Sequence, residues 1–288
     1  MVARVICPSV VLALSALLLP QGGAQKTALV TVVADAAGPV RDLTARDFVV
    51  HEDNAKREVI SASSSDDPLS IALLLDTTQP PMGVPYPTQD VRGALATFVK
   101  TIMAASPDAQ IALMQYSGAS VTTVDFAAPA GDMDKAIQRL YPNPQAMSVL
   151  LEALTDAGKK LKARPAPRRA IVVVDFNAPE SSAERTMKVA VESVHDAGAT
   201  VWPISIRGTA PAAAATREEV LNKLTQANGG MRLSAVDATS LEALLKSVAN
   251  SLTSQYVVTF VRPNGSSPKT TEFATTKGTK VLLTPFMR

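Results

Sequence analysis

The sequence predicts an α/β protein with a doubly wound, mostly parallel sheet and a small β domain built from N- and C-terminal strands. Two patterns predict this fold. In the middle of the chain, four apolar runs of strand length alternate with amphipathic segments of helix length. On both sides of this region, short β-rich segments are separated by turn residues. Alternation of strand and helix favours a parallel sheet covered on both faces, with right-handed crossovers.

Residues 1–24 have the pattern of a secretory signal peptide. Arg4 makes the start basic, residues 10–19 form an apolar run, and residues 22–24 are small enough for a cleavage site. The run is shorter than the roughly 18 to 20 apolar residues that an anchor needs. Cys7 precedes the run, which argues against a lipoprotein signal. We therefore expect an exported protein, periplasmic or secreted, without a stable membrane anchor.

The composition excludes several classes of function. Cys7 is the only cysteine, so loss of the signal peptide leaves no disulfide, thiolate metal site or cysteine nucleophile. The formal net charge of the whole chain is +2, which gives no reason to expect nucleic acid as a partner. The sequence carries no motif of phosphate-binding loops, dinucleotide-binding turns, α/β-hydrolase nucleophiles or zinc proteases. We therefore expect no enzyme activity.

The N-terminal β segment spans residues 27–65. Its expected strands are residues 27–33, 47–52 and 58–60. Three strands make a marginal unit alone, so we expect them to pair with strands from residues 254–288. The candidates there are residues 256–261 and 280–284.

The central domain is expected over residues 68–252. Its apolar runs, each a predicted buried strand, are residues 69–75, 111–114, 170–174 and 200–206. The clearest helix places Val91, Leu95 and Phe98 on one face. Because ligands of such folds bind at the carboxyl ends of the strands, the loop after Leu75 is the first candidate site.

That loop reads Asp76-Thr77-Thr78-Gln79-Pro80, so a buried strand delivers a carboxylate and hydroxyl groups to the carboxyl edge of the sheet. This arrangement resembles a von Willebrand factor type A domain. Over residues 27–262 the chain is similar to the bacterial, Acidobacterial-type von Willebrand factor A-related family. The segments that carry this similarity are residues 47–54, 168–174 and 254–258.

The resemblance implies a metal-ion-dependent adhesion site. In the family, a D-x-S-x-S loop, a threonine on a second loop and an aspartate on a third hold a divalent cation, which accepts a partner's carboxylate. Here Asp76 matches the first ligand, Thr78 replaces the first serine, and Pro80 replaces the second serine and offers no ligand. On the second loop, Ser148 stands in for the threonine.

On the third loop, an ungapped match puts Phe176 where the aspartate belongs. Asp175 is adjacent, but it should point to the opposite side of an extended strand. The resemblance therefore implies a degenerate site, in which Asp76, Thr78, Ser148 and a shifted Asp175 hold Mg²⁺ or Ca²⁺ weakly or not at all. We favour the alternative in which Asp76 caps nearby backbone N–H groups and no ion binds.

Residues 80–87 depart from a polar metal loop, because four of them are prolines. Met82 and Tyr86 offer apolar contact area, so this loop is a candidate for partner binding without metal. The alternative is a spacer leading into the helix that we expect near Thr88.

Together these observations predict an exported, non-catalytic, adhesion-type domain that docks a protein partner at the carboxyl edge of the sheet, with weak or lost metal dependence. Two alternatives stay open. One is a secreted hydrolase that uses Asp76 and Asp175 as a carboxylate pair. The other is a periplasmic scaffold whose β domain pairs edge to edge with another protein.

Overall fold

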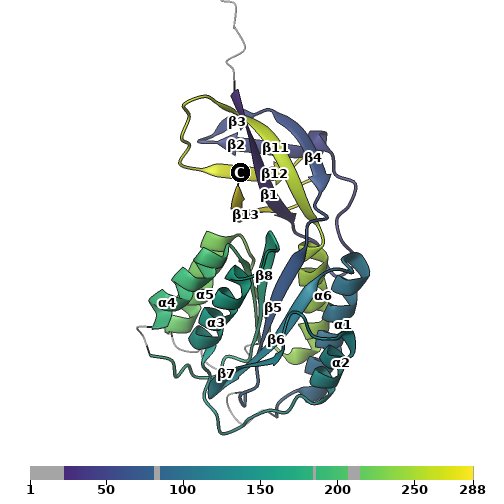
Figure 1. Cartoon of the computed structure of the whole chain (residues 1–288), viewed down its shortest axis with the longest axis vertical. Helices are drawn as coiled ribbons and strands as arrows, with labels where there is room; N and C mark the ends of the chain where they lie inside the picture. Colours follow the sequence, from purple (N-terminus) through teal and green to yellow (C-terminus); the bar gives the residue numbers. More distant parts are fainter. Residues whose placement is uncertain (1–22, 81–84, 184–185, 207–214, 288) are drawn as a thin grey trace, which may run out of the picture.

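The computed structural model describes residues 23–80, 85–183, 186–206 and 215–287, which form an α/β domain and a β domain (Figure 1). The α/β domain is built on a six-stranded sheet in the order β10-β9-β8-β5-β6-β7, parallel except for β7. Its strands are β5 (Leu69–Asp76), β6 (Gln110–Ser117), β7 (Ala119–Val124), β8 (Arg168–Asp175), β9 (Thr200–Ile206) and β10 (Leu233–Ala235).

Helices cover both faces of this sheet because its central strands are apolar on both sides. All residues of β5, β8 and β9 except Arg169 are buried. Alternate residues of β5 enter different cores, with Leu73 on one face and Leu74 on the other. The first face packs against α1 (Thr88–Ala105), α2 (Ala130–Gln138) and α6 (Leu241–Leu252). The second packs against α3 (Leu150–Lys162), α4 (Thr186–Ala197) and α5 (Ala215–Asn228).

The β domain joins the two ends of the chain. A four-stranded sheet has the order β13-β1-β11-β4, and a three-stranded sheet has the order β12-β2-β3. The strands are β1 (Gly23–Val32), β2 (Phe48–Glu52), β3 (Ala55–Arg57), β4 (Val59–Ser64), β11 (Gln255–Pro263), β12 (Thr271–Thr275) and β13 (Val281–Met287). The described residues also contain 3₁₀ turns at Ala45–Asp47 and Ala238–Ser240.

The predicted fold class is confirmed, including the small β domain made from both terminal regions. The first strand pairs with β11 from Gly23 to Thr31, so it also contains Gly23 and Ala24 of the segment that we expected to be a signal peptide. Residues 1–22 lie outside the described residues. None of the helices that the structure describes is long and apolar enough to span a bilayer.

The β domain covers the amino end of the large sheet, and the carboxyl edge lies at the opposite end of the molecule (Figure 1). Arg168, the first residue of β8, joins the two domains and is buried. Its guanidinium donates to Gln255 Oε1 at 2.7 Å, to the carbonyl oxygens of Ser65 and Asp67 at 2.9 and 3.0 Å, and to that of Leu252 at 2.8 Å. The contact that Arg168 makes between the domains therefore lies at the amino end of the large sheet.

Candidate functional site

Three loops meet at the carboxyl edge of the sheet. The loop after β5 pairs with the segment before α3 through Thr78 and Asn143, and that segment pairs with the loop after β8 through Ser148 and Glu180. These bridges bring together all four residues that the resemblance implied as metal ligands. Asp76, Thr78, Ser148 and Asp175 are each at most 1% exposed.

Asp76 is held by donors of the protein itself. Its Oδ1 accepts hydrogen bonds from the backbone N–H of Thr78 at 2.9 Å and from the Thr78 hydroxyl, and its Oδ2 accepts from the Phe176 N–H at 3.3 Å. Burial, reinforced by the negative charge of Asp175, raises the pKa of Asp76 to about 7. Both oxygens of this carboxyl group are thus occupied inside the protein.

The centre of the site is a guanidinium group. Arg217, near the start of α5, is fully buried. Its Nη1 donates to Asp175 Oδ1 at 3.1 Å and to the carbonyl oxygen of Ala178. Its Nη2 donates to Glu180 Oε2 at 3.0 Å and to the Ser148 hydroxyl. Two carboxylates, a hydroxyl and a carbonyl therefore converge on one fixed cation.

The acidic groups of this cluster stabilise the positive charge of Arg217. Burial alone lowers the pKa of Arg217, but the neighbouring acidic groups, Asp175 first, raise it above the ordinary value of an arginine. Glu180 also accepts two backbone hydrogen bonds: its Oε2 accepts from the Leu150 N–H at 3.1 Å, and its Oε1 accepts from the Ser182 N–H at 3.1 Å. Leu150 is the first residue of α3, where a negative charge is favourable.

Phe176 and Asp175 point to opposite faces, as the alternation of a strand requires. Phe176 is buried in the core beside α1 and α6, and Tyr86 packs on it with ring centroids 5.0 Å apart. The Tyr86 hydroxyl donates to the carbonyl oxygen of Asp76 at 2.7 Å, and this side chain is half-buried. Met82, the other predicted partner contact, lies outside the described residues.

The residues at the edge do not fit a divalent cation. Pro80 and Phe176 supply no ligand, the oxygens of Asp76 accept from the protein, and Arg217 takes Ser148 Oγ and Asp175 Oδ1. In the part of the chain that the structure describes, no group of three or more His, Cys, Asp or Glu side chains is placed to hold a metal. Asp175 Oδ2 is buried and has no hydrogen-bond partner. The ion pair of Arg217 with the other oxygen of this carboxylate offsets only part of the cost of burying Oδ2.

Sequence reasoning missed Arg217 and Glu180. The available signal for Arg217 was its place in the first turn of a helix, where the helix dipole disfavours a cation. A basic residue there needs compensation from elsewhere in the fold. Nothing in the local sequence around Glu180 distinguishes it from a surface residue.

Exposed apolar side chains also lie at this edge. Tyr141 and Met147, on the segment between α2 and α3, are 72% and 52% exposed, and Val236, just after β10, is 69% exposed. The guanidinium of Arg92 lies 5.5 Å from the centre of the Tyr141 ring, which steadies that ring in its exposed position. We refer to Tyr141, Met147 and Val236 as the apolar rim.

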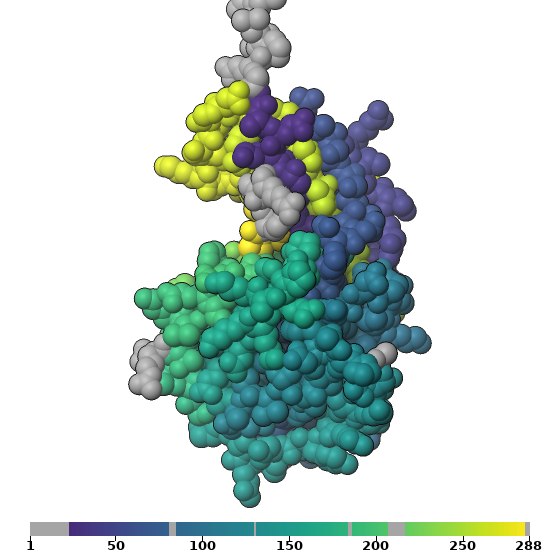
Figure 2. Space-filling model, viewed as in Figure 1, coloured from purple at the N-terminus to yellow at the C-terminus, as the bar shows by residue number. Residues whose placement is uncertain are grey.

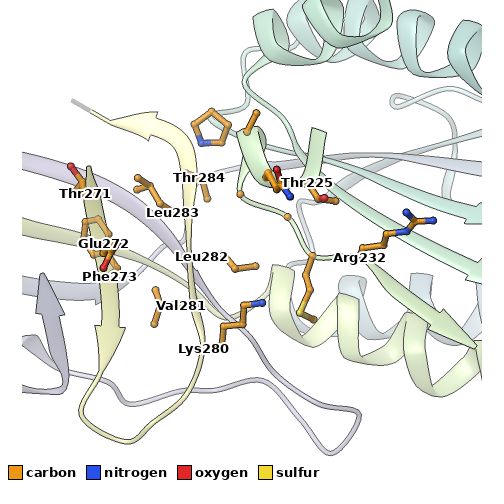
Figure 3. A pocket seen from close by; sticks show the side chains of 16 residues that line it. Thr225, Arg232, Thr271, Glu272, Phe273, Lys280, Val281, Leu282, Leu283 and Thr284 are labelled. Carbon is orange, nitrogen blue, oxygen red and sulfur yellow. The ribbon is translucent and has the colours of Figure 1, made fainter. Parts of the chain in front are cut away.

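A hollow at the other end of the α/β domain is lined by residues of both domains (Figure 2). Its volume is about 860 Å³, and it lies between the C-terminal end of α5 and strands β12 and β13 (Figure 3). Arg232 on its wall is paired with Glu218 at 2.5 Å. The hollow is lined by residues at the C-terminal end of α5, whereas Arg217 lies in the first turn of this helix.

Comparison with known proteins places this architecture. The family model of the von Willebrand factor type A domain matches residues 70–247. The structure described as von Willebrand factor type A from Catenulispora acidiphila has a TM-score of 0.55 at 9% identity, covering 94% of this chain and 74% of that one. A search of curated proteins finds no match.

Two components of bacterial pili share the fold. The PilB minor pilin from Streptococcus sanguinis has a TM-score of 0.53 at 12% identity, covering 66% of this chain and 62% of that one. The pilus adhesin SpaC from Lactobacillus rhamnosus GG has a TM-score of 0.50 at 12% identity, covering 67% and 32%. This chain thus spans less than two thirds of either protein, and at these identities the likeness concerns the fold alone. The family model, which matches more than half of the sequence, shows that the chain belongs to the von Willebrand factor type A domain family.

Proposed function

We propose that this chain is an exported, non-catalytic interaction domain that docks a protein partner at the carboxyl edge of its sheet without a divalent cation. The observation that carries the proposal is the pairing of an exposed apolar rim with a buried cluster at the same edge. Tyr141, Met147 and Val236 offer the contact area that interfaces favour. The β domain at the opposite end does not obstruct them.

Three further observations support it. Residues 1–24 have the pattern of a signal peptide, which favours export. The structures that share the fold include a minor pilin and a pilus adhesin, which favours an adhesion-type domain. Both carboxyl groups of the alternative hydrolase pair, Asp76 and Asp175, are fully buried, which disfavours catalysis on an external substrate. The Acidobacterial-type subfamily and the scaffold alternative stay predictions.

Affinity capture from the native cell envelope tests the proposal. The bait is the mature chain, and the rim variant carries Tyr141→Ser and Met147→Ser. A matched control carries Ile60→Ser, a 44% exposed apolar residue on β4 of the β domain. We expect a protein that the wild type and the control retain, with or without EDTA, and that the rim variant loses.

Two results would contradict the proposal. Equal capture by the rim variant would remove the carboxyl edge as the docking surface. Loss of capture in EDTA, restored by Mg²⁺, would show metal-dependent docking.

A further inference from the structure

We propose that the Arg217 guanidinium replaces the divalent cation of the adhesion site: it is a built-in cation that joins the loops of the carboxyl edge and closes them to metal. The inference deepens the proposed function and rests on it only for the consequence for docking. The ion-binding test below needs no partner, so the two proposals can fail separately.

The first argument is the set of oxygens around the guanidinium. Ser148 comes from the segment before α3, whereas Asp175, Ala178 and Glu180 come from the end of β8 and the loop after it. Carboxylate, hydroxyl and carbonyl oxygens are also the ligands that Mg²⁺ and Ca²⁺ take. The loops therefore form a convergent set of oxygens of the kind that binds a cation, and the guanidinium of Arg217 on α5 occupies it.

The second argument is burial. The side chains of Arg217, Asp175 and Ser148 are fully buried, and that of Glu180 is 4% exposed. A buried carboxylate pair without a cation is costly, so the cluster needs a permanent positive charge. A guanidinium supplies one without exchange with solvent, and each of its two terminal nitrogens donates to two acceptors here.

The third argument is the location of Arg217 itself. It lies in the first turn of α5, where the positive end of the helix dipole opposes a cation. Helix preference therefore does not explain an arginine here, whereas the carboxylates of Asp175 and Glu180 do. The same contacts tie the start of α5 to the loop after β8.

A consequence for docking follows. A bound metal presents an open coordination position to a partner's carboxylate, but all contacts of Arg217 are directed inward and its side chain has no exposed area. A partner of this domain must therefore bind the surrounding surface, such as the apolar rim, instead of a central cation.

Mn²⁺ titration of the purified mature protein tests the inference, with the free Mn²⁺ signal in electron paramagnetic resonance and the Tm as readouts. We expect millimolar Mn²⁺ to leave both unchanged in the wild type. Arg217→Ala opens the site and leaves two carboxylates unpaired, which lowers the Tm by roughly 10 °C. Mn²⁺ should then bind this variant and recover part of the lost Tm.

Arg168→Ala is the matched control. Arg168 is a buried arginine that donates to an amide and three backbone carbonyls, and the carboxylates near it, Asp66 and Asp67, are exposed, so its removal leaves no buried carboxylate unpaired. This variant should lose stability without recovery by Mn²⁺. Mn²⁺ binding by the wild type that Asp175→Asn abolishes would overturn the inference, as would a folded Arg217→Ala that Mn²⁺ does not stabilise. If Arg217→Ala does not fold, the wild-type titration alone decides between these outcomes.

Discussion

A buried arginine lies at each end of strand β8: Arg168 is its first residue, and Arg217 of α5 pairs with its last residue, Asp175. The two ends differ in what surrounds the guanidinium. At the amino end Arg168 meets an amide oxygen and backbone carbonyls, and it joins the two domains. At the carboxyl end Arg217 meets the carboxylates of Asp175 and Glu180. Burial lowers the pKa of Arg168 to about 10, whereas the pKa of Arg217 rises above its ordinary value because acidic groups outweigh burial.

The acceptors around each guanidinium indicate the role of that arginine. A guanidinium among neutral oxygens satisfies hydrogen bonds and fixes a domain boundary. A guanidinium among carboxylates supplies the counter-charge that offsets the cost of burying them. The same residue type thus stabilises the molecule at one end and takes the place of an ion at the other.

The largest effects are expected from alanine substitution at each arginine in turn, and the two losses of stability should differ. Arg217→Ala should lower the free energy of unfolding by about 3 to 5 kcal/mol, because it leaves buried carboxylates without a counter-charge. Arg168→Ala should cost about 1 to 3 kcal/mol, because the groups left behind are neutral acceptors. Urea unfolding measures both values, and equal losses would contradict the distinction.

Double-mutant cycles measure the coupling energy of a single residue pair at each end of β8. The cycle of Arg217→Met with Asp175→Asn should give a coupling energy of about 2 to 3 kcal/mol, since it removes a buried ion pair. The cycle of Arg168→Met with Gln255→Ala should give about 1 kcal/mol, as for a bond to a neutral acceptor. A stronger coupling at the amino end would reverse the assignment of roles.

The sheet and its site loops could be predicted from the sequence because their signals are local. Runs such as residues 71–75 are apolar at every position, and the carboxyl ends of parallel strands share one edge, so Asp76 and Asp175 had to lie close together. Ser148 is implied by the family resemblance alone. Arg217 could not be found this way. It lies 42 and 69 residues from Asp175 and Ser148, and only the packing of α5 brings it to them.

Shorter elements were missed for another reason. Strands β7 and β12 alternate exposed and buried residues over five or six positions, and β7 is stabilised by its antiparallel pairing with β6. Such a pattern is weak without knowledge of the neighbouring strand. In the large sheet, the sequence therefore predicts the buried central strands and misses the edge strands β7 and β10.

Stability should depend on pH at the carboxyl end. The pKa of Asp76 is about 7 in the folded protein, against 3.8 for an ordinary aspartate, so between these values the folded state binds the proton more tightly. The contribution of this group therefore decreases as pH rises from about 4 to about 7, by an amount on the order of a few kcal/mol. Asp76→Asn should remove this part of the pH dependence in urea unfolding.

Asp67→Asn is the control for that experiment, because Asp67 is an exposed carboxylate at the amino end. It should keep the wild-type dependence over the same window. An Asp76→Asn protein with the wild-type pH profile would show that another group causes the dependence.

The smallest expected effect concerns Tyr86. Its loop is interpreted either as a partner-binding loop or as a spacer that leads into the next helix. Tyr86→Phe removes the hydrogen bond to the Asp76 carbonyl but keeps the ring on Phe176, so the free energy of unfolding should fall by about 1 kcal/mol. Tyr141→Phe, at a 72% exposed side chain, should change it by less than about 0.5 kcal/mol. Envelope capture by Tyr86→Phe should match the wild type, because the hydroxyl is turned inward to Asp76. Loss of capture without loss of stability would instead place Tyr86 in the docking surface and extend that surface from the apolar rim to the loop after β5.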